Sequence, residues 1–259
     1  MTWLTARRMG IIVAMAFVAG LIKFLPANIF EARINVALPS PWSAAVSGTV
    51  WDGHGVLRAG QSAEALRIPL TWKFDLAALL GLTASWELAS TSSAISGTTN
   101  LGIGWSALNL RNAALTFDAG ALAPHHPLLA LAAPSGSIQV STPNGKTLVL
   151  HTRDTFRLNG ELHVAATAFS VRPLSGNLSG DYTAKLSAQD ARVSYTLRQR
   201  KGALNLDGNG IIDMASRGLG YSGLIAPSPE LPEAMLQQLK SIGKAAPDGR
   251  LRLDWTTQW

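Results

Sequence analysis

The residue types that most often do chemistry are few and widely spaced in this chain. The five histidines, His54, His125, His126, His151 and His163, show neither H-E-x-x-H nor any other metal-binding spacing. The sparse carboxylates form no close pair suited to acid and base roles. The chain has no cysteine, which excludes thiolate catalysis, disulfides and cysteine-based zinc sites. We therefore expect a protein that is not an enzyme and that binds no metal or cofactor.

One glycine-rich segment imitates a binding motif without the context that such a motif needs. Gly218 to Gly223 satisfies G-x-G-x-x-G, but the residues from 224 to 230 contain two prolines and open no helix. A dinucleotide site requires that glycine motif to connect a strand to a helix. We interpret this segment, and Asp207-Gly208-Asn209-Gly210, as turns.

Alternation of apolar and polar residues dominates the chain after residue 25. In Leu66 to Phe74 every even position is apolar, so one face of this strand should be buried and the other solvated. Pro69 cannot donate to a sheet, which places it at an edge or a bulge. Similar strands are expected at 84–88, 137–141, 182–186, 193–197 and 251–255, with turns at Asn144-Gly145, Asn159-Gly160 and Gln189-Asp190.

The spacing of these strands indicates a mainly β fold. Turns about ten residues apart suit antiparallel meanders and leave no room for parallel crossovers. The apolar face needs a cover, so we expect either a sandwich or an open, groove-like sheet. One amphipathic helix, with Leu231, Met235, Leu239 and Ile242 on one stripe and Gly243 as its stop, should cap the sheet.

A single uncharged segment runs from Met9 to Ile22, directly after Arg7 and Arg8, and it extends to Leu25 when the Lys23 side chain reaches up to the membrane surface. As a helix it would span about 26 Å, close to the roughly 30 Å of a hydrocarbon core. A cleaved signal peptide and a buried core helix are the alternatives. A signal peptide is disfavoured because Leu25-Pro26-Ala27 lacks a small residue at its first position, and a core helix because large apolar residues cover every face.

This segment predicts the domain organisation. Residues 1–8 would be a cytoplasmic N-terminus, residues 9–25 a transmembrane helix and residues 26–259 a β-rich periplasmic domain, since long trailing domains are exported largely regardless of charge. The protein would then be a single-pass protein of the cell inner membrane. The net charge of +6 falls to +3 beyond the anchor, because three of the 22 basic residues and none of the 16 acidic ones precede residue 25. We therefore expect no nucleic-acid partner.

A short motif stands out near the start of the exported part. Gly48 and Gly53 bracket Thr49-Val50-Trp51, which we expect to be an apolar strand with Trp51 as a large packing surface. Trp72 follows in the next alternating strand. We interpret Gly48, Trp51, Gly53 and Trp72 as a signature for structure or for interaction, with a structural role favoured for Trp51.

Val46 to Gly53 resembles the V-x-G-x-[LV]-W-x-G signature of the N protein of the bacterial type II secretion system. Leu70-Thr71-Trp72, the stretch 79–82 and the closing helix, D-G-R and strand pattern over 236–253 are similar to that family too. The resemblance implies a non-catalytic inner-membrane subunit that assists export of folded proteins across the outer membrane, with other inner-membrane subunits as partners. The alternative from the alternation itself is a membrane-tethered β groove that binds or transfers lipid.

Overall fold

The structure is a computed structural model that describes residues 20, 23–38, 40–60, 66–81, 83–104, 106–122, 133–151, 157–170, 179–202, 204–227, 231 and 233–258. The predicted anchor over 9–25 lies almost entirely outside these residues, and so does the pair His125 and His126. Within the described ranges, no helix is both long enough and apolar enough to cross a membrane.

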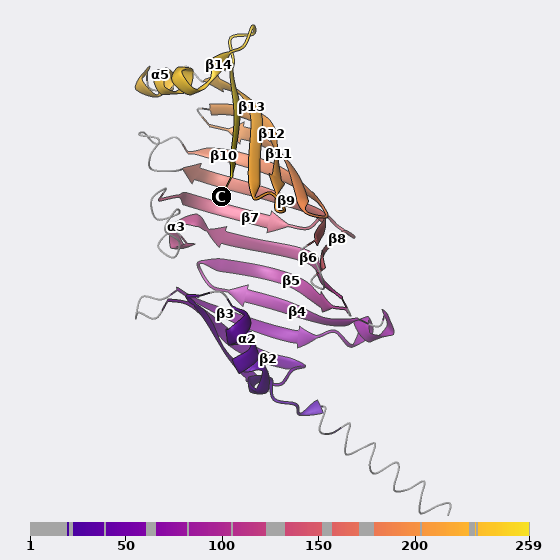
Figure 1. Cartoon of the computed structure of the whole chain (residues 1–259). Coiled ribbons are helices and arrows are strands. Elements are labelled where there is room, and N and C mark those ends of the chain that lie inside the picture. The colour runs from indigo at the N-terminus through magenta and orange to yellow at the C-terminus, as the bar shows by residue number, and fades with distance from the viewer. Residues whose placement is uncertain are drawn as a thin grey trace, which may run out of the picture.

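All strands of the described residues belong to one antiparallel sheet of 15 strands, stacked nearly in chain order (Figure 1). Among these, only two strands depart from the meander: β8 pairs with β6 and β9, and β14 lies outside β15. The strands are β1 (Trp42–Gly48), β2 (Asp52–Ala59), β3 (Leu66–Phe74), β4 (Ala84–Thr91), β5 (Ile95–Ile103), β6 (Ala107–Asp118), β7 (Ser135–Ser141), β8 (Thr147–His151), β9 (Arg157–Ser170), β10 (Gly180–Gln189), β11 (Arg192–Lys201), β12 (Leu204–Asp213), β13 (Gly218–Pro227), β14 (Lys244–Ala245) and β15 (Leu251–Gln258).

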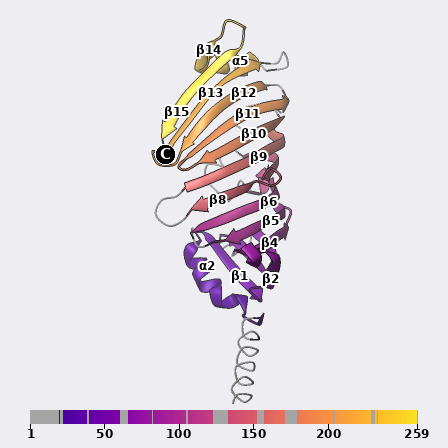
Figure 2. The same ribbon diagram turned by 90° about the vertical axis from the view of Figure 1, so that its right-hand side faces the viewer.

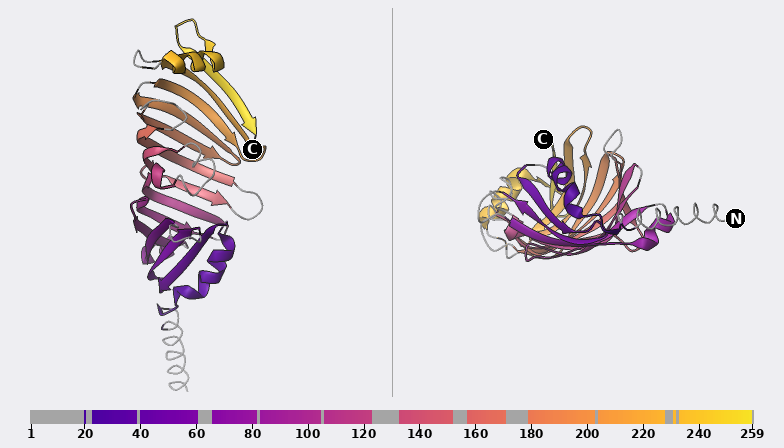
Figure 3. Two further views of the ribbon diagram at one scale, coloured as in Figure 1. Left: turned by 90° about the vertical axis from the view of Figure 1, so that its left-hand side faces the viewer. Right: turned by 90° about the horizontal axis from the view of Figure 1, so that it is seen from below.

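The prediction of a mainly antiparallel, meander-rich β domain is therefore confirmed. β1 and β14 are the two edges and do not pair with each other, so the sheet is open. The described strands form a single layer that curves into a trough when viewed along its length (Figure 3). A two-sheet sandwich is therefore not the architecture of these residues, and the open, groove-like alternative describes them.

The helices are short and lie around the sheet. They are η1 (Ala27–Phe30), α2 (Glu31–Ala37), η2 (Leu76–Gly81), α3 (Ala119–Leu122) and α5 (Glu233–Ile242). The predicted capping helix is α5, and its last turn closes where Gly243 N donates to Leu239 O over 2.8 Å. It lies at the β14 and β15 end, whereas α2 lies beside β1 at the other end (Figure 2). It caps the last strands and leaves most of the sheet uncovered.

The strand at Leu66 to Phe74 shows how closely alternation and structure agree. β3 has the predicted bounds, with Ile68 and Phe74 buried and the residues between them alternately exposed. Pro69 faces Val56 of β2, while β4 pairs only with Thr71 to Phe74. Pro69 therefore lies where β3 has a partner on one side alone, as a residue without an N–H requires.

Some of the predicted turns are confirmed by the structure, and others were wrong. Asn144-Gly145 and Gln189-Asp190 lie at the turns after β7 and β10. The turn predicted at Asn159-Gly160 was wrong, because both residues pair within β9. The two glycine-rich segments at 207–210 and 218–223 are also strand, within β12 and β13. These two segments form strands because tyrosine rings lie over their glycines.

Candidate functional site

One face of the sheet carries an apolar row that crosses eight neighbouring strands. Direct cross-strand partners connect the row from β6 to β15 without interruption. In strand order the members are Leu115, Val140, Val164, Ala184, Leu197, Gly208, Gly223 and Leu253. Because partners in register point to the same side, these residues form one continuous apolar strip.

The apolar face is more buried than the polar face although no second layer covers it in the described residues. On β11, Val193 is buried and Leu197 half-buried, while Ser194 and Thr196 are exposed. Side chains converge on the inner side of a curved sheet and diverge on the outer side, so the apolar face lines the inside of the trough. None of the large side chains in the described ranges is fully buried, and alanines make up much of the buried set. The trough is therefore lined by apolar groups that are only partly shielded from solvent.

Tyrosine rings explain why the glycine-rich segments are strands. A Cβ atom on Gly208 or on Gly223 would lie only 2.6 Å from Cζ of Tyr221, so its ring occupies the space that side chains would need. Tyr195 covers Gly210 in the same way. An aromatic ring laid across a strand glycine restores the packing that the glycine lacks.

The two tyrosine hydroxyls differ in their partners. Tyr195 Oη donates to Gly220 O over 3.2 Å. The hydroxyl of Tyr221 is buried and has no hydrogen-bond partner among the described residues. Burial, with smaller contributions from Tyr195 and Asp207, raises the pKa of Tyr221 to about 12. This tyrosine is therefore neutral at physiological pH, and its ring forms part of the apolar face.

Trp72 lies on β3, near the β1 edge of the sheet. Its ring lies on Gly53, where a Cβ atom would overlap the indole and would lie 2.6 Å from Ser47 O. The indole Nε1 donates to Thr49 O over 2.9 Å. Of the four predicted signature residues, Gly53 and Trp72 thus form one direct packing pair.

Gly48 is required by the backbone. Its φ of +88° lies in the left-handed region, and a Cβ atom there would approach Cα of Gly53 to 2.8 Å. The residues between the two glycines do not form the expected strand. Thr49, Val50 and Trp51 are instead the turn that joins β1 to β2, with Thr49 N donating to Asp52 O over 2.9 Å. The prediction of a strand at 49–51 was wrong because a positive φ at Gly48 turns the chain.

Trp51 completes an aromatic cluster beside that turn. Its ring meets Phe74 edge to face at 4.7 Å between centroids, and Phe74 meets Trp86 at 5.2 Å. Trp86 Nε1 donates to Val50 O over 2.8 Å. Trp86 is not one of the predicted signature residues, although its place in an alternating strand close to Trp72 could have suggested it.

The turn at residues 49–51 also binds the segment that precedes the sheet. Val50 N donates to Leu25 O over 3.0 Å, and Pro26 bridges to Thr49. The turn is therefore fixed on one side by two indole N–H groups and on the other by Leu25, the last residue of the predicted anchor, and by Pro26. Its role in the described structure is to attach that segment to the sheet.

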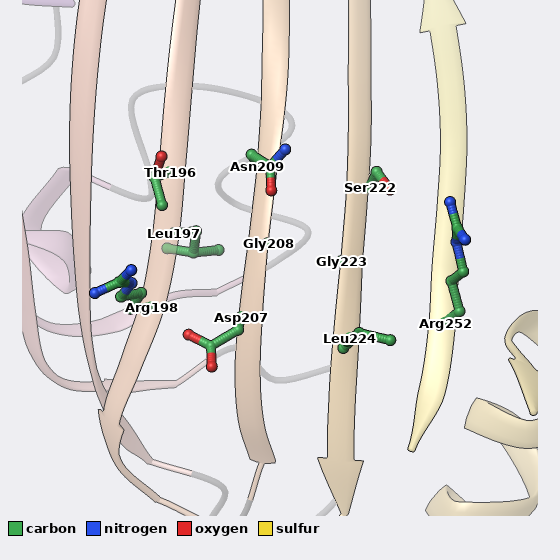
Figure 4. Close-up of a pocket in the computed structure, with 10 residues that line it drawn as sticks. All are labelled: Thr196, Leu197, Arg198, Asp207, Gly208, Asn209, Ser222, Gly223, Leu224 and Arg252. Carbon is green, nitrogen blue, oxygen red and sulfur yellow. The ribbon is translucent and has the colours of Figure 1, made fainter. Parts of the chain in front are cut away.

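A shallow hollow lies over β11, β12, β13 and β15 (Figure 4), and its lining includes Leu197, Gly208 and Gly223 of the apolar row beside polar and charged residues. Its volume is about 570 Å³, and Arg198, Asp207 and Arg252 bring charge to its lining. Next to it, the Ser222 hydroxyl donates to Asp254 over 2.6 Å and lowers the pKa of that carboxyl, with help from Arg252. An ionised, hydrogen-bonded carboxylate is a poor proton donor at neutral pH, so Asp254 does not suit the role of a general acid.

The described histidines lie on separate strands, His54 on β2, His151 on β8 and His163 on β9. In the part of the chain that the structure describes, no three histidine, aspartate or glutamate side chains are grouped so that they could hold a metal ion. The clearest functional feature of these residues is therefore the apolar trough.

A family model for protein N of the type II secretion system matches residues 42–254. The match includes the turn signature, the apolar row and most of β15, so it extends well beyond the motif on which the resemblance rested. Neither a curated protein nor a solved structure matches the chain. The chain belongs to the type II secretion system protein N family.

Proposed function

We propose that this protein is a non-catalytic inner-membrane subunit that assists assembly or operation of the machine exporting folded proteins across the outer membrane. Family membership supports a place in that machine. The inner-membrane part is supported by the apolar sequence that ends at Leu25, and the hydrogen bond from Val50 N to Leu25 O connects the sheet to that end. It joins the sheet to the last residue of the predicted anchor without a flexible spacer.

The proposed topology follows the sequence. Residues 1–8 lie in the cytoplasm, residues 9–25 cross the inner membrane, and residues 26–259 lie in the periplasm. Other inner-membrane subunits of the secretion machine are the proposed partners. An open sheet with two accessible faces suits work by protein contact.

Deletion of the gene tests this function. Enzymes that use the machine should accumulate in the periplasm, because their inner-membrane export is separate, and complementation with the full chain should restore secretion. A strain that secretes these enzymes at the parental rate would contradict the proposed function. The amount of a substrate that stops at the inner membrane serves as the control and should not change.

A second candidate function is lipid binding, which the uncovered apolar row favours. Leu115, Val140, Val164 and Leu197 present aliphatic side chains along the trough, and none of the large side chains described is fully buried. Acyl chains would shield such a strip from water. Lipid extraction and mass spectrometry of the purified chain test this candidate. Bound acyl chains at one or more per protein, retained through exchange into lipid-free detergent, support it, and their absence contradicts it.

A further inference from the structure

The helix beside β1 is attached to the sheet through its polar side. Asn35 Nδ2 donates to Ala44 O over 2.9 Å, and Ala44 N donates to Asn35 Oδ1 over 2.6 Å. One turn earlier, the carboxylate of Glu31 accepts a hydrogen bond from Val46 N over 3.0 Å. These two side chains satisfy backbone groups that an edge strand would otherwise leave open.

The same segment exposes several large apolar side chains. Val36 is 88% exposed, Ile29 is 52% exposed, and Phe30 and Ile34 are exposed as well. Phe30 and Ile34 are four residues apart and therefore share one side of the helix, whereas Val36, two residues after Ile34, lies on a different side. A helix that packs on a water-soluble domain normally shows the reverse arrangement, with its apolar side inward. Something other than the sheet must cover this surface, which we call the η1–α2 surface.

Position and charge indicate what covers it. Ile29 follows Leu25, the last residue of the predicted anchor, by only four positions, and Phe24 beside it is 71% exposed. The charged residues here are Lys23, Glu31 and Arg33, and Glu31 is engaged with β1. The outward charge is therefore positive, which suits an anionic membrane surface.

We propose that the η1–α2 surface lies in the surface of the lipid bilayer, with Ile29, Phe30, Ile34 and Val36 at the boundary between headgroups and acyl chains. This inference depends on the proposed anchor. Eleven residues of helix reach only about 17 Å, so Val36 cannot lie far from the end of the anchor. A helix that lies in this interface buries its apolar side chains by about 5–10 Å and keeps its basic side chains at the headgroups.

A membrane-bound α2 would set the orientation of the sheet relative to the bilayer. Because Asn35 and Glu31 hold β1 against α2, a membrane-bound α2 brings the β1 edge to the bilayer. The trough would then begin at the membrane surface, at its β1 end, and extend away from the membrane toward β15 (Figure 1).

Single cysteines test the proposal cleanly because the chain contains none. Full-length Val36→Cys and the control Ser194→Cys, exposed on the polar face of β11, are labelled with an environment-sensitive fluorophore. Both are reconstituted into vesicles of phosphatidylethanolamine and phosphatidylglycerol. Some vesicles carry lipids with a nitroxide quencher just below the headgroup.

We expect strong quenching at position 36 and none at position 194. In a second assay, a water-soluble maleimide should modify the unlabelled Val36→Cys variant in vesicles more slowly than Ser194→Cys, by about tenfold, the factor that corresponds to about 1.4 kcal/mol. Equal quenching at the two positions overturns the proposal. Protection of position 36 without quenching, or a disulfide that joins two chains through position 36, also overturns it, because the cover would then be a second copy.

The proposed anchor and this inference can fail separately. If the chain leaves the vesicles in an alkaline wash, the anchor itself is refuted, and the inference with it. If the chain stays in the vesicles while position 36 remains unquenched, the anchor holds and only the inference about the η1–α2 surface is wrong.

Discussion

The indole of Trp72 donates to the carbonyl oxygen of Thr49 over 2.9 Å, across a glycine that leaves no room for a side chain. Trp86 makes the equivalent bond to Val50 over 2.8 Å. Two tryptophans from β3 and β4 thus hold one turn between β1 and β2. Since Val50 also binds Leu25, this arrangement links the sheet to the segment that enters the membrane in our proposal.

Gly53→Ala should destabilise the protein strongly. The added methyl group would overlap the Trp72 ring and approach Ser47 O, so we expect a loss of about 3 kcal/mol in the free energy of unfolding. Denaturant titration of the full chain in detergent, followed by tryptophan fluorescence, measures it. Gly220→Ala is the matched control, because its nearest neighbour would be Ile211 O at 4.0 Å. The interpretation fails if both alanines have the same effect.

Tyr221→Phe and Tyr195→Phe should have opposite effects. Removing the buried, unpartnered hydroxyl of Tyr221 should raise the free energy of unfolding by about 1 kcal/mol, whereas Tyr195→Phe loses the bond to Gly220 O and should lower it by about 1 kcal/mol. Denaturation midpoints at neutral pH measure both changes. A loss of stability in Tyr221→Phe as large as that in Tyr195→Phe would contradict the described arrangement.

Tyr221 also predicts a loss of stability in alkali. Its pKa rises from 10.0 to about 12 on folding, so above pH 10 the unfolded state loses this proton first. Stability is then fully present below pH 10 and falls as the pH rises toward 12. Thermal unfolding across this range should show a smaller decline in Tyr221→Phe than in the parent chain. Equal declines would assign the alkaline sensitivity to other groups.

Asn35→Ala should weaken the β1 edge. The substitution removes both hydrogen bonds to Ala44 and should lower the free energy of unfolding by about 2 kcal/mol. Because open edges pair with other chains, self-association should increase as well. Light scattering in detergent detects this, with the exposed Asn28→Ala as the control. A fully monomeric and equally stable Asn35→Ala variant would show that these bonds do not protect the edge.

Filling the trough should displace lipid if the second candidate function is correct. Ala184 lies in the apolar row between Val164 and Leu197, so the ring of Ala184→Trp would occupy space in the trough above this row. Ser187→Trp places the same ring on the exposed polar side of β10. Acyl chains that copurify with the parent should fall several-fold in the first variant only, with circular dichroism confirming that both fold. An equal lipid content in the two variants would place the lipid elsewhere.

Alternation predicted the strands well where one face meets water. Leu66 to Phe74 became β3 with its expected bounds, and Pro69 lies where the strand has one neighbour. The capping helix was also found, because its apolar stripe and the terminal Gly243 are both local signals. Such features depend on residues close together in the sequence.

Other features depend on distant residues and could not be read locally. The glycines at 208 and 223 look like turn residues until the ring of Tyr221 is placed over them. Glu31 and Asn35 look like ordinary helix surface, yet they bind the β1 edge. Whether the sheet would close on itself also lay beyond the sequence, since alternation is the same in a sandwich and in an open sheet.

The central claim is that a single N-terminal helix holds this open sheet on the periplasmic side of the inner membrane. The most direct test fuses a reporter enzyme, active only outside the cytoplasm, after Gln258 and measures its activity in alkali-washed membranes. We predict full activity in the membrane fraction, carried by a chain that retains the predicted anchor over 9–25. An inactive fusion, or an active one released as a trimmed, soluble polypeptide, would contradict the claim.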